Sequence, residues 1–251
     1  MKRFSEKALS SIFFVLTITG VILLWSLFAR LINSEYILPT VIQTVKAFPN
    51  LIKGGLFSAL LGTLFRSFIA FLISFILALV LAILSSKSKI GRYIINPLSA
   101  ITRALPTIAI VLLLLFWTTS KIAPMVVTTI VVFPTVYTGI LNALNSFDKD
   151  LYNVSKVYNI PRKQMLFKVY LPQIMPDMLI LIGANLSLNI KLMVAAEVLS
   201  QTANSVGFML NSAKAYFEIS SMLAIVVLTV AIGLCLELVF NGIARKVGKW
   251  K

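Results

Sequence analysis

Residues 150–172, DLYNVSKVYNIPRKQMLFKVYLP, form a polar and basic segment in a chain that is otherwise strongly apolar. Leu151, Val154 and Tyr158 follow the i, i+3, i+7 spacing that places side chains on one face of a helix. Asn159 then supplies a residue that tolerates the left-handed conformation with which helices commonly end. The first half of the segment is therefore predicted to be a short helix with one apolar stripe.

The second half of the segment is predicted to be another short helix. Pro161 suits a first helical turn, because its missing N–H would have no partner there. Met165, Leu166 and Val169 give this helix an apolar stripe, and Pro172 is expected to stop it. A helix, a break, a second helix and a stop are the layout expected of an ordered docking element.

Composition places the rest of the chain in a membrane. Its 251 residues are 59% hydrophobic and 12% charged, about half the charged fraction of ordinary soluble domains. Histidine is absent and Cys235 is the single cysteine, which excludes a Cys/His metal site or a disulfide framework within one chain. We predict no metal site, no catalytic residue and no cofactor held by this chain.

Hydropathy predicts an all-α membrane protein with six transmembrane helices, built as one transmembrane domain over residues 1–251. A connection of about residues 145–175 separates the fourth span from the fifth. The predicted spans are Ala8–Ile32, Leu56–Ser86, Ala104–Ser120, Ala123–Ala143, Pro176–Leu199 and Ile219–Ala244.

The basic residues give the orientation, since cytoplasmic connections carry an excess of lysine and arginine. One set of connections holds most of them, so both termini and the loop at 145–175 are predicted to be cytoplasmic. The net charge of +15 follows from this bias, and no nucleic-acid partner is predicted. The cytoplasmic set is Lys2, Arg3, Lys7, Lys87, Lys89, Arg92, Arg103, Lys149, Lys156, Arg162, Lys163, Lys168, Arg245, Lys246, Lys249 and Lys251, against Arg30, Lys46, Lys53, Lys121 and Lys214 outside.

Two interpretations of the loop remain open on pattern alone. It is either a docking element for a cytosolic protein or an amphipathic hairpin on the membrane lipid, where its basic residues meet anionic headgroups.

The spacing in the loop resembles the signature of ABC-importer permeases. That signature reads E-A-A, three residues, G, nine residues, I-x-L-P. Here Asn153-Val154-Ser155 stands at E-A-A, Asn159 at the glycine, and Val169-Tyr170-Leu171-Pro172 at the end. The glutamate, the paired alanines and the glycine are replaced, and asparagine serves a backbone role similar to that of glycine.

Further short matches, in order along nearly the whole chain, resemble the permeases for sulfonate, taurine, nitrate and thiamine-precursor import. They are Trp25 with Leu38-Pro39-Thr40, Arg66-Ser67, Arg103-Ala104-Leu105-Pro106-Thr107-Ile108-Ala109, Phe133-Pro134-Thr135, Val194-Ala195-Ala196-Glu197, Ser205-Val206-Gly207-Phe208 and Trp250.

The resemblance implies a type I ABC-importer permease in the plasma membrane of a bacterium. Two permease copies, identical or sister chains, would form the pathway, and an extracytoplasmic binding protein would deliver the substrate. A cytosolic ATPase dimer would bind ATP and magnesium, since this chain has no G-x-x-x-x-G-K-[ST] loop. The cargo would be a small organic anion or a heterocyclic vitamin precursor. The ATPase-docking residues would be Leu151, Asn153, Val154, Ser155, Tyr158, Asn159, Pro161, Leu171 and Pro172.

Arg66, Lys191 and Glu197 are the candidate pathway residues, because charges inside spans are costly and mark functional sites. Lys191 and Glu197 are six residues apart, so an ideal helix rotates them apart and they do not pair. Glu197 is expected to pair with Arg66 or with a symmetry mate. Lys191 gives an anion pathway a positive lining, has a structural partner or lies in a water-filled cavity.

Two other classes of function compete with the ABC importer. A secondary transporter or channel subunit would need no ATPase, and a non-transporting scaffold would use the loop for another partner. The former commonly shows inverted repeats, which this sequence does not display.

Overall fold

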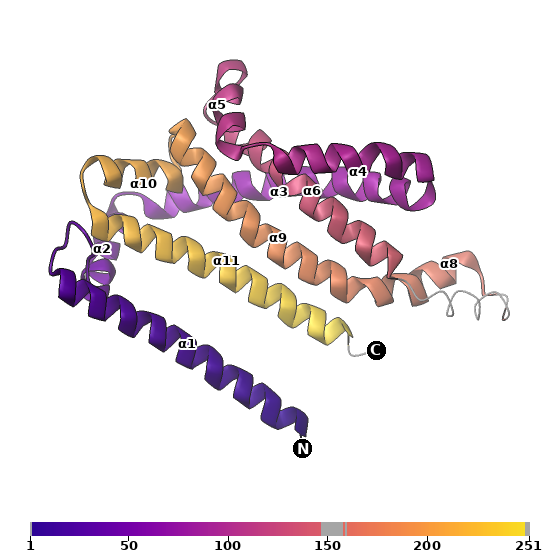
Figure 1. The fold of residues 1–251 in the computed structure, drawn as a ribbon, viewed down its shortest axis with the longest axis horizontal. Coiled ribbons are helices and arrows are strands. Elements are labelled where there is room, and N and C mark those ends of the chain that lie inside the picture. Colours follow the sequence, from indigo (N-terminus) through magenta and orange to yellow (C-terminus); the bar gives the residue numbers. More distant parts are fainter. Residues whose placement is uncertain (1, 147–157, 159, 249–251) are drawn as a thin grey trace. The chain divides into compact units, whose positions relative to one another are not determined.

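The computed structural model describes residues 2–146, 158 and 160–248. These residues form helices joined by short connections, with no strand in the part described (Figure 1). The elements are α1 (Lys2–Ile32), α2 (Val41–Lys53), α3 (Leu56–Lys87), α4 (Lys89–Ala104), α5 (Thr107–Trp117), α6 (Ala123–Asn145), α8 (Arg162–Met165), the π-helical turn η1 (Leu166–Tyr170), α9 (Leu171–Ser200), α10 (Val206–Ala215) and α11 (Ile219–Val247).

The chain divides into two compact units. Unit 1 comprises residues 1–57 and 209–227, and unit 2 comprises residues 58–208 and 228–251. The prediction of one permease domain over 1–251 stays a prediction.

Helix α9 is central to unit 2. It packs most extensively along α6 and also contacts α5 (Figure 1). On a third side, the Asn189 amide donates to the Ser67 carbonyl of α3 at 2.7 Å. On a fourth side, a Cβ added at Gly233 of α11 would lie 2.7 Å from Ser187 Oγ. Glycine thus lies where α11 approaches α9 closely, as is common for small residues between membrane helices.

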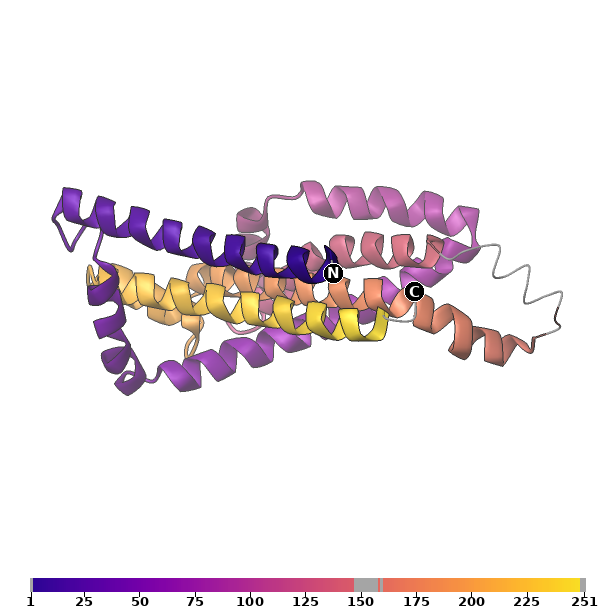
Figure 2. The same ribbon diagram turned by 90° about the horizontal axis from the view of Figure 1, so that it is seen from below.

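A buried tyrosine ties three helices of unit 2 together. Tyr137 of α6 is fully buried, and its hydroxyl oxygen lies 2.8 Å from Ser85 Oγ of α3 and 2.9 Å from Asn96 Oδ1 of α4. Figure 2 shows α4 running alongside α6, as these bonds require. Phe71, Val132, Val136 and other apolar side chains surround the tyrosine.

The predicted all-helical membrane fold is confirmed. Among the described residues, five helices are long and apolar enough to cross a membrane, or six if the bent pair of α4 and α5 counts as one span. The predicted spans Leu56–Ser86, Ala123–Ala143 and Ile219–Ala244 agree with α3, α6 and α11 to within three residues at each end.

The predicted third span, Ala104–Ser120, contains one helix, α5, whose 11 residues are too few to cross a membrane alone. The sequence analysis did not predict α4, which precedes α5 and meets it at a bend of 94°. Leu105 and Pro106 are extended at the break, with φ and ψ of −69° and 129°, and −65° and 116°. The cause is Pro106, which restricts the residue before it to extended conformations and ends α4 there.

The predicted stop at Pro172 is also wrong. Apolar helix continues from Lys163 to Ser200 across both Pro172 and Pro176. The wider π-helical turn η1 comes just before Pro172, and the Leu171 N–H bonds the Leu166 carbonyl five residues earlier. Such a turn relieves the crowding and the lost hydrogen bond that proline imposes on a regular helix.

Unit 1 contains α2, a helix that hydropathy did not predict because it does not span. Helix α2 begins with a capping box. The Thr40 side chain accepts a hydrogen bond from the Gln43 N–H, and the Gln43 side chain accepts one from the Thr40 N–H. The Trp25 indole of α1 donates to the Pro39 carbonyl at 2.9 Å, which fixes the connection between α1 and α2.

Candidate functional site

The predicted docking residues lie partly within the described chain. Leu151, Asn153, Val154, Ser155 and Asn159 lie outside the described residues. Tyr158, Pro161 and Pro172 are exposed to solvent, and Leu171 is half-buried. The structure therefore describes only some of the predicted docking residues, and the role of the loop in docking stays a prediction.

Glu197, near the end of α9, is the centre of a buried polar network in unit 2. Its carboxylate is fully buried and accepts a hydrogen bond at 2.8 Å from Thr63 Oγ1 of α3. Arg66 of α3 donates to the other carboxylate oxygen, from Nε at 2.8 Å and from a terminal nitrogen at 2.7 Å. Of the two partners expected for Glu197, the structure shows Arg66.

The network also holds the segment that follows α9. Thr63 Oγ1 accepts from the Val206 N–H at 3.0 Å, and Arg66 donates to the Asn204 carbonyl at 3.3 Å. The Gly207 N–H lies 3.4 Å from the Glu197 carboxylate. We call these groups the Glu197 network: Glu197, Arg66, Thr63 and the backbone of Asn204, Val206 and Gly207.

The local sequence explains how the chain reaches this network. Gln201 ends α9 in the left-handed conformation, with φ of 50° and ψ of 44°. Ser205 then accepts the Phe208 N–H at 2.9 Å, as a helix N-cap does. A Cβ added at Gly207 would lie 2.6 Å from the Val198 N atom, so only glycine permits this approach to α9. A carboxylate beside a helix start is also favoured by the helix dipole.

Both carboxylate oxygens of Glu197 are thus occupied by donors within the chain. A buried carboxylate held in this way is suited to joining α3, α9 and the start of α10. The roles of Arg66 and Glu197 in the pathway remain a prediction.

The sequence motifs Arg66-Ser67, Val194–Glu197 and Ser205–Phe208, which are distant along the chain, meet in this network. Sequence reasoning missed Thr63. Its signal was its position three residues before Arg66, which places both side chains on one helix face.

Lys191 lies away from the network, on a face of α9 that is exposed in the part of the chain that the structure describes. No hydrogen bond or ion pair of its ammonium group is found within the described part of the chain. Its Cε would lie 3.9 Å from a Cβ at Gly233, so its stem runs beside α11. We call this surface the open face of α9, formed by Ile180, Ala184, Leu188, Lys191 and Ala195.

Sequence comparison identifies the relatives of this chain. Residues 70–249 match the family described as binding-protein-dependent transport system inner membrane component. The chain is 27% identical over 236 residues to a protein of Bacillus subtilis (strain 168) described as an aliphatic sulfonates transport permease, SsuC, covering 92% of this chain and 84% of that one. It is 26% identical over 163 residues to the taurine transport system permease protein TauC of Escherichia coli (strain K12), covering 63% and 58%.

Solved structures share the fold at low sequence identity. A chain of the MetNI methionine ABC transporter in an inward-facing conformation aligns with a TM-score of 0.64 and 19% identity, covering 78% of this chain and 97% of that one. A chain of a bacterial alginate ABC transporter, solved with an alginate-bound periplasmic protein, aligns with a TM-score of 0.64 and 16% identity, covering 97% and 98%.

The family match covers most of the chain, and the helical fold and the relatives agree with it. The chain therefore belongs to the binding-protein-dependent transport system inner membrane components, as a multi-pass permease subunit of an ABC importer.

Proposed function

We propose that this permease carries small organic anions, with sulfonates as the first class to test, across a bacterial plasma membrane. A second permease subunit would complete the pathway, and a cytosolic ATPase that binds ATP and magnesium would drive it. An extracytoplasmic binding protein would deliver the anion. The observation that carries the anion assignment is Lys191 on the open face of α9.

The depth of Lys191 supports this assignment. At a rise of about 1.5 Å per residue, its Cα is about 22 Å along the helix from Pro176 and about 12 Å from Leu199. A lysine at the centre of a span costs about 2.5–3.5 kcal/mol to insert. If Lys191 faced lipid, no interaction would offset this cost. If it faced a water-filled pathway between two permeases, its ammonium group would stay hydrated and the cost would not arise. A cation at that place attracts anions.

The sulfonate class is supported by the relatives. SsuC and TauC are described as permeases for aliphatic sulfonates and for taurine, and both cargo classes carry a sulfonate anion. A heterocyclic vitamin precursor would not require a cation at Lys191.

Coupling to the ATPase is supported by the continuity of helix from the loop to Lys191. Helix runs from Lys163 to Ser200 without a break. At its loop end the Tyr170 hydroxyl donates to the Leu144 carbonyl of α6 at 3.3 Å. A displacement of the loop by an ATPase would therefore move α9, on which Lys191 lies.

We expect Lys191→Gln to lower uptake of taurine or a short alkanesulfonate by about ten- to a hundredfold at limiting substrate. This range corresponds to one charge-assisted hydrogen bond of about 1.5–3 kcal/mol. The measurement is ATP-driven uptake of radiolabelled substrate into proteoliposomes that hold the permease, its ATPase and its binding protein.

Lys191→Arg is the matched control, since it keeps the charge and is expected to retain most uptake. The affinity of the binding protein for the sulfonate should be the same in all assays. Equal uptake by the wild type and Lys191→Gln would contradict the anion assignment.

The competing reading as a secondary transporter or channel is tested in the same vesicles. We expect no concentrative uptake without ATP or without the ATPase subunit. Uptake driven by an ion or substrate gradient alone would contradict the proposed coupling to an ATPase.

A further inference from the structure

Helix α4 carries a row of exposed polar and basic side chains along its whole length. They fall at i, i+3, i+7, i+11 and i+14, a spacing that places them on one side of a helix. We call this row the polar stripe of α4. It consists of Lys89, Arg92, Asn96, Ala100 and Arg103, all of them exposed.

Helix α4 packs lengthwise along α6 (Figure 2). Ile95 of α4 belongs to the apolar cluster around Tyr137, and the Asn96 amide oxygen lies 2.9 Å from the Tyr137 hydroxyl. Tyr137 comes eight residues before the end of α6 at Asn145, which is about 12 Å by helical rise. An amphipathic helix that rests on the membrane surface would lie across the helix ends instead. Helix α4 therefore forms the inner part of the span that it makes with α5.

Arg103 then lies deep within this span. Helix α3 ends at Lys87 and α4 begins at Lys89, and both lysines are predicted to be cytoplasmic. Arg103 follows Lys89 after 14 residues, about 21 Å along the helix, in a hydrocarbon layer about 30 Å thick. Hydropathy alone predicts Arg103 in a cytoplasmic connection, whereas α4 carries it to the bend of 94° before α5.

The Arg103 side chain is directed back toward the start of α4. Its Nε donates to the Ser99 carbonyl, one turn earlier, at 3.4 Å. No ion pair of its guanidinium is found among the residues that the structure describes. Lys191 is about 22 Å along α9 from Pro176, so these two exposed cations lie at nearly the same depth. Charged side chains at such depth almost always face the protein interior or a water-filled cavity.

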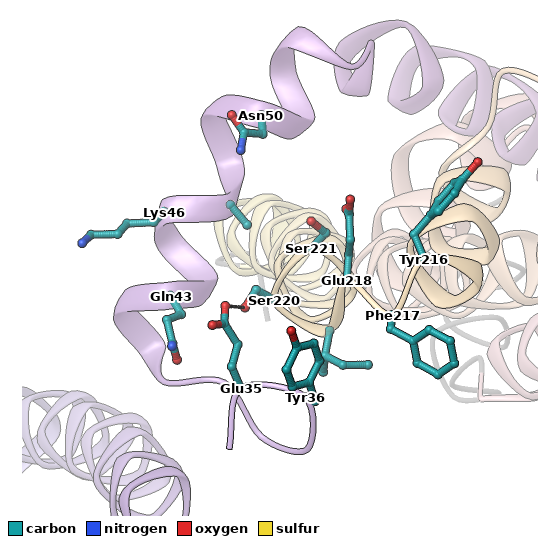
Figure 3. Close-up of a pocket in the computed structure, with 12 residues that line it drawn as sticks. Glu35, Tyr36, Gln43, Lys46, Asn50, Tyr216, Phe217, Glu218, Ser220 and Ser221 are labelled. Atoms are coloured by element: carbon teal, nitrogen blue, oxygen red, sulfur yellow. Dashed lines mark hydrogen bonds between the residues drawn. The ribbon is translucent and has the colours of Figure 1, made fainter. Parts of the chain in front are cut away.

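The charge of the polar stripe has one sign. Residues 89–104 include three basic residues and no acidic residue. A cavity lined by one sign of charge concentrates ions of the opposite sign. By contrast, Glu35, Glu218 and Lys46 line a pocket of about 520 Å³ in unit 1 (Figure 3), and this mixture of signs favours neither anions nor cations. The polar stripe of α4 is thus suited to anions.

We propose that the polar stripe of α4 lines the inner part of an anion pathway and that Arg103 contacts the anion at the depth of Lys191. This inference rests on the proposed function, since it takes an organic anion as the cargo. The planar guanidinium of Arg103 can donate two parallel hydrogen bonds to two oxygens of one oxyanion. Further toward the cytoplasm, Arg92 and Lys89 continue the positive lining.

The first experiment measures whether the polar stripe meets water. The full chain with Cys235→Ser, which removes the single cysteine, is assembled with its ATPase in vesicles of uncharged phosphatidylcholine. One cysteine is then introduced, as Ala100→Cys on the stripe or as Leu98→Cys. The probes are the anionic 2-sulfonatoethyl methanethiosulfonate and its cationic 2-trimethylammonioethyl counterpart. We expect Ala100→Cys to react about tenfold faster than Leu98→Cys, because a thiol in apolar surroundings stays protonated and unreactive.

Leu98→Cys is the matched control, since it lies on the same helix at nearly the same depth. Leu98 belongs to a separate, apolar face of α4, which also includes Ile90, Ile94 and Ile101.

The second experiment measures the charge of Arg103 at Ala100→Cys, three residues earlier on the stripe. We expect Arg103→Gln to lower the ratio of the anionic to the cationic reaction rate by about tenfold, because one charge acts on the two probes in opposite directions. Uptake of taurine at limiting concentration should fall by about tenfold as well. Arg103→Lys keeps the charge and should retain the rate ratio. Arg103 is exposed and bonds only the Ser99 backbone, so the variants are expected to fold.

The outcomes separate this inference from the proposed function. If Ala100→Cys reacts no faster than Leu98→Cys, the polar stripe does not line an aqueous path and the inference fails. A rate ratio that does not change in Arg103→Gln would also overturn it. Taurine uptake that requires Lys191 but is unchanged in Arg103→Gln would support the proposed function and overturn the role of Arg103. The expected reaction rates without sulfonate uptake by the wild type would support an anion path and contradict sulfonates as its cargo.

Discussion

Replacing Arg66 with methionine is expected to destabilise the permease by about 3–5 kcal/mol. This is the usual cost of removing one partner from a buried ion pair, and here Glu197 would stay fully buried with its charge uncompensated. For a domain of this size the loss corresponds to about 6–20 °C in Tm. The measurement is thermal unfolding of the detergent-solubilised chain, followed by intrinsic tryptophan fluorescence.

The double variant Arg66→Met/Glu197→Gln is the test of mechanism. Without a charge on Glu197 the methionine leaves nothing uncompensated, so the double variant should be more stable than Arg66→Met alone. We expect a coupling of about 1–3 kcal/mol, as for side chains in one network. If the losses of stability from the two single substitutions simply add in the double variant, Arg66 and Glu197 stabilise the protein independently. That result would contradict the role of the Glu197 network in stabilising this region.

The second large effect is expected in the loop at 145–175. Val154→Asp should weaken ATPase binding by about 30- to 1000-fold, since disrupting an anchor residue at an interface costs about 2–4 kcal/mol. Val154 lies outside the described residues, so this expectation rests on the apolar stripe of Leu151, Val154 and Tyr158. The measurement is co-purification of the ATPase with the tagged permease, followed by titration of the isolated subunits.

Val154→Leu is the control, because it keeps an apolar side chain at the same place and should retain the ATPase. Membrane insertion should be unaffected in both variants, as judged by extraction with detergent but not with alkaline carbonate. Unchanged ATPase binding by Val154→Asp would move the docking surface elsewhere. It would also favour the other interpretation of the loop, as a hairpin on the lipid surface.

Hydropathy predicted the spans well because the membrane imposes a strong and local requirement. About 20 consecutive apolar residues are needed to cross it, and α3, α6 and α11 satisfy this requirement in their own sequence. The two failures occurred at prolines. Pro106 lies at a sharp bend, whereas the helix continues through Pro172 after the π-helical turn η1. The presence of a proline in the sequence does not predict which of these two outcomes occurs.

The candidate site was only partly predictable. The costly charges Arg66 and Glu197 stand out in the sequence, and their pairing was one of two alternatives. The role of Thr63 and the requirement for glycine at 207 depend on how α3, α9 and α10 approach one another.

The sequence by itself determined the helical membrane class and the family, because apolar length and short motifs are local properties of the chain. The tertiary structure decided which charged side chains are buried with hydrogen-bond partners and which are exposed. Glu197 is enclosed by donors from α3 and the start of α10, whereas Lys191, six residues earlier on the same helix, remains exposed. That difference arises from helix packing, which sets the surroundings of each face and is not encoded in the spacing of either residue.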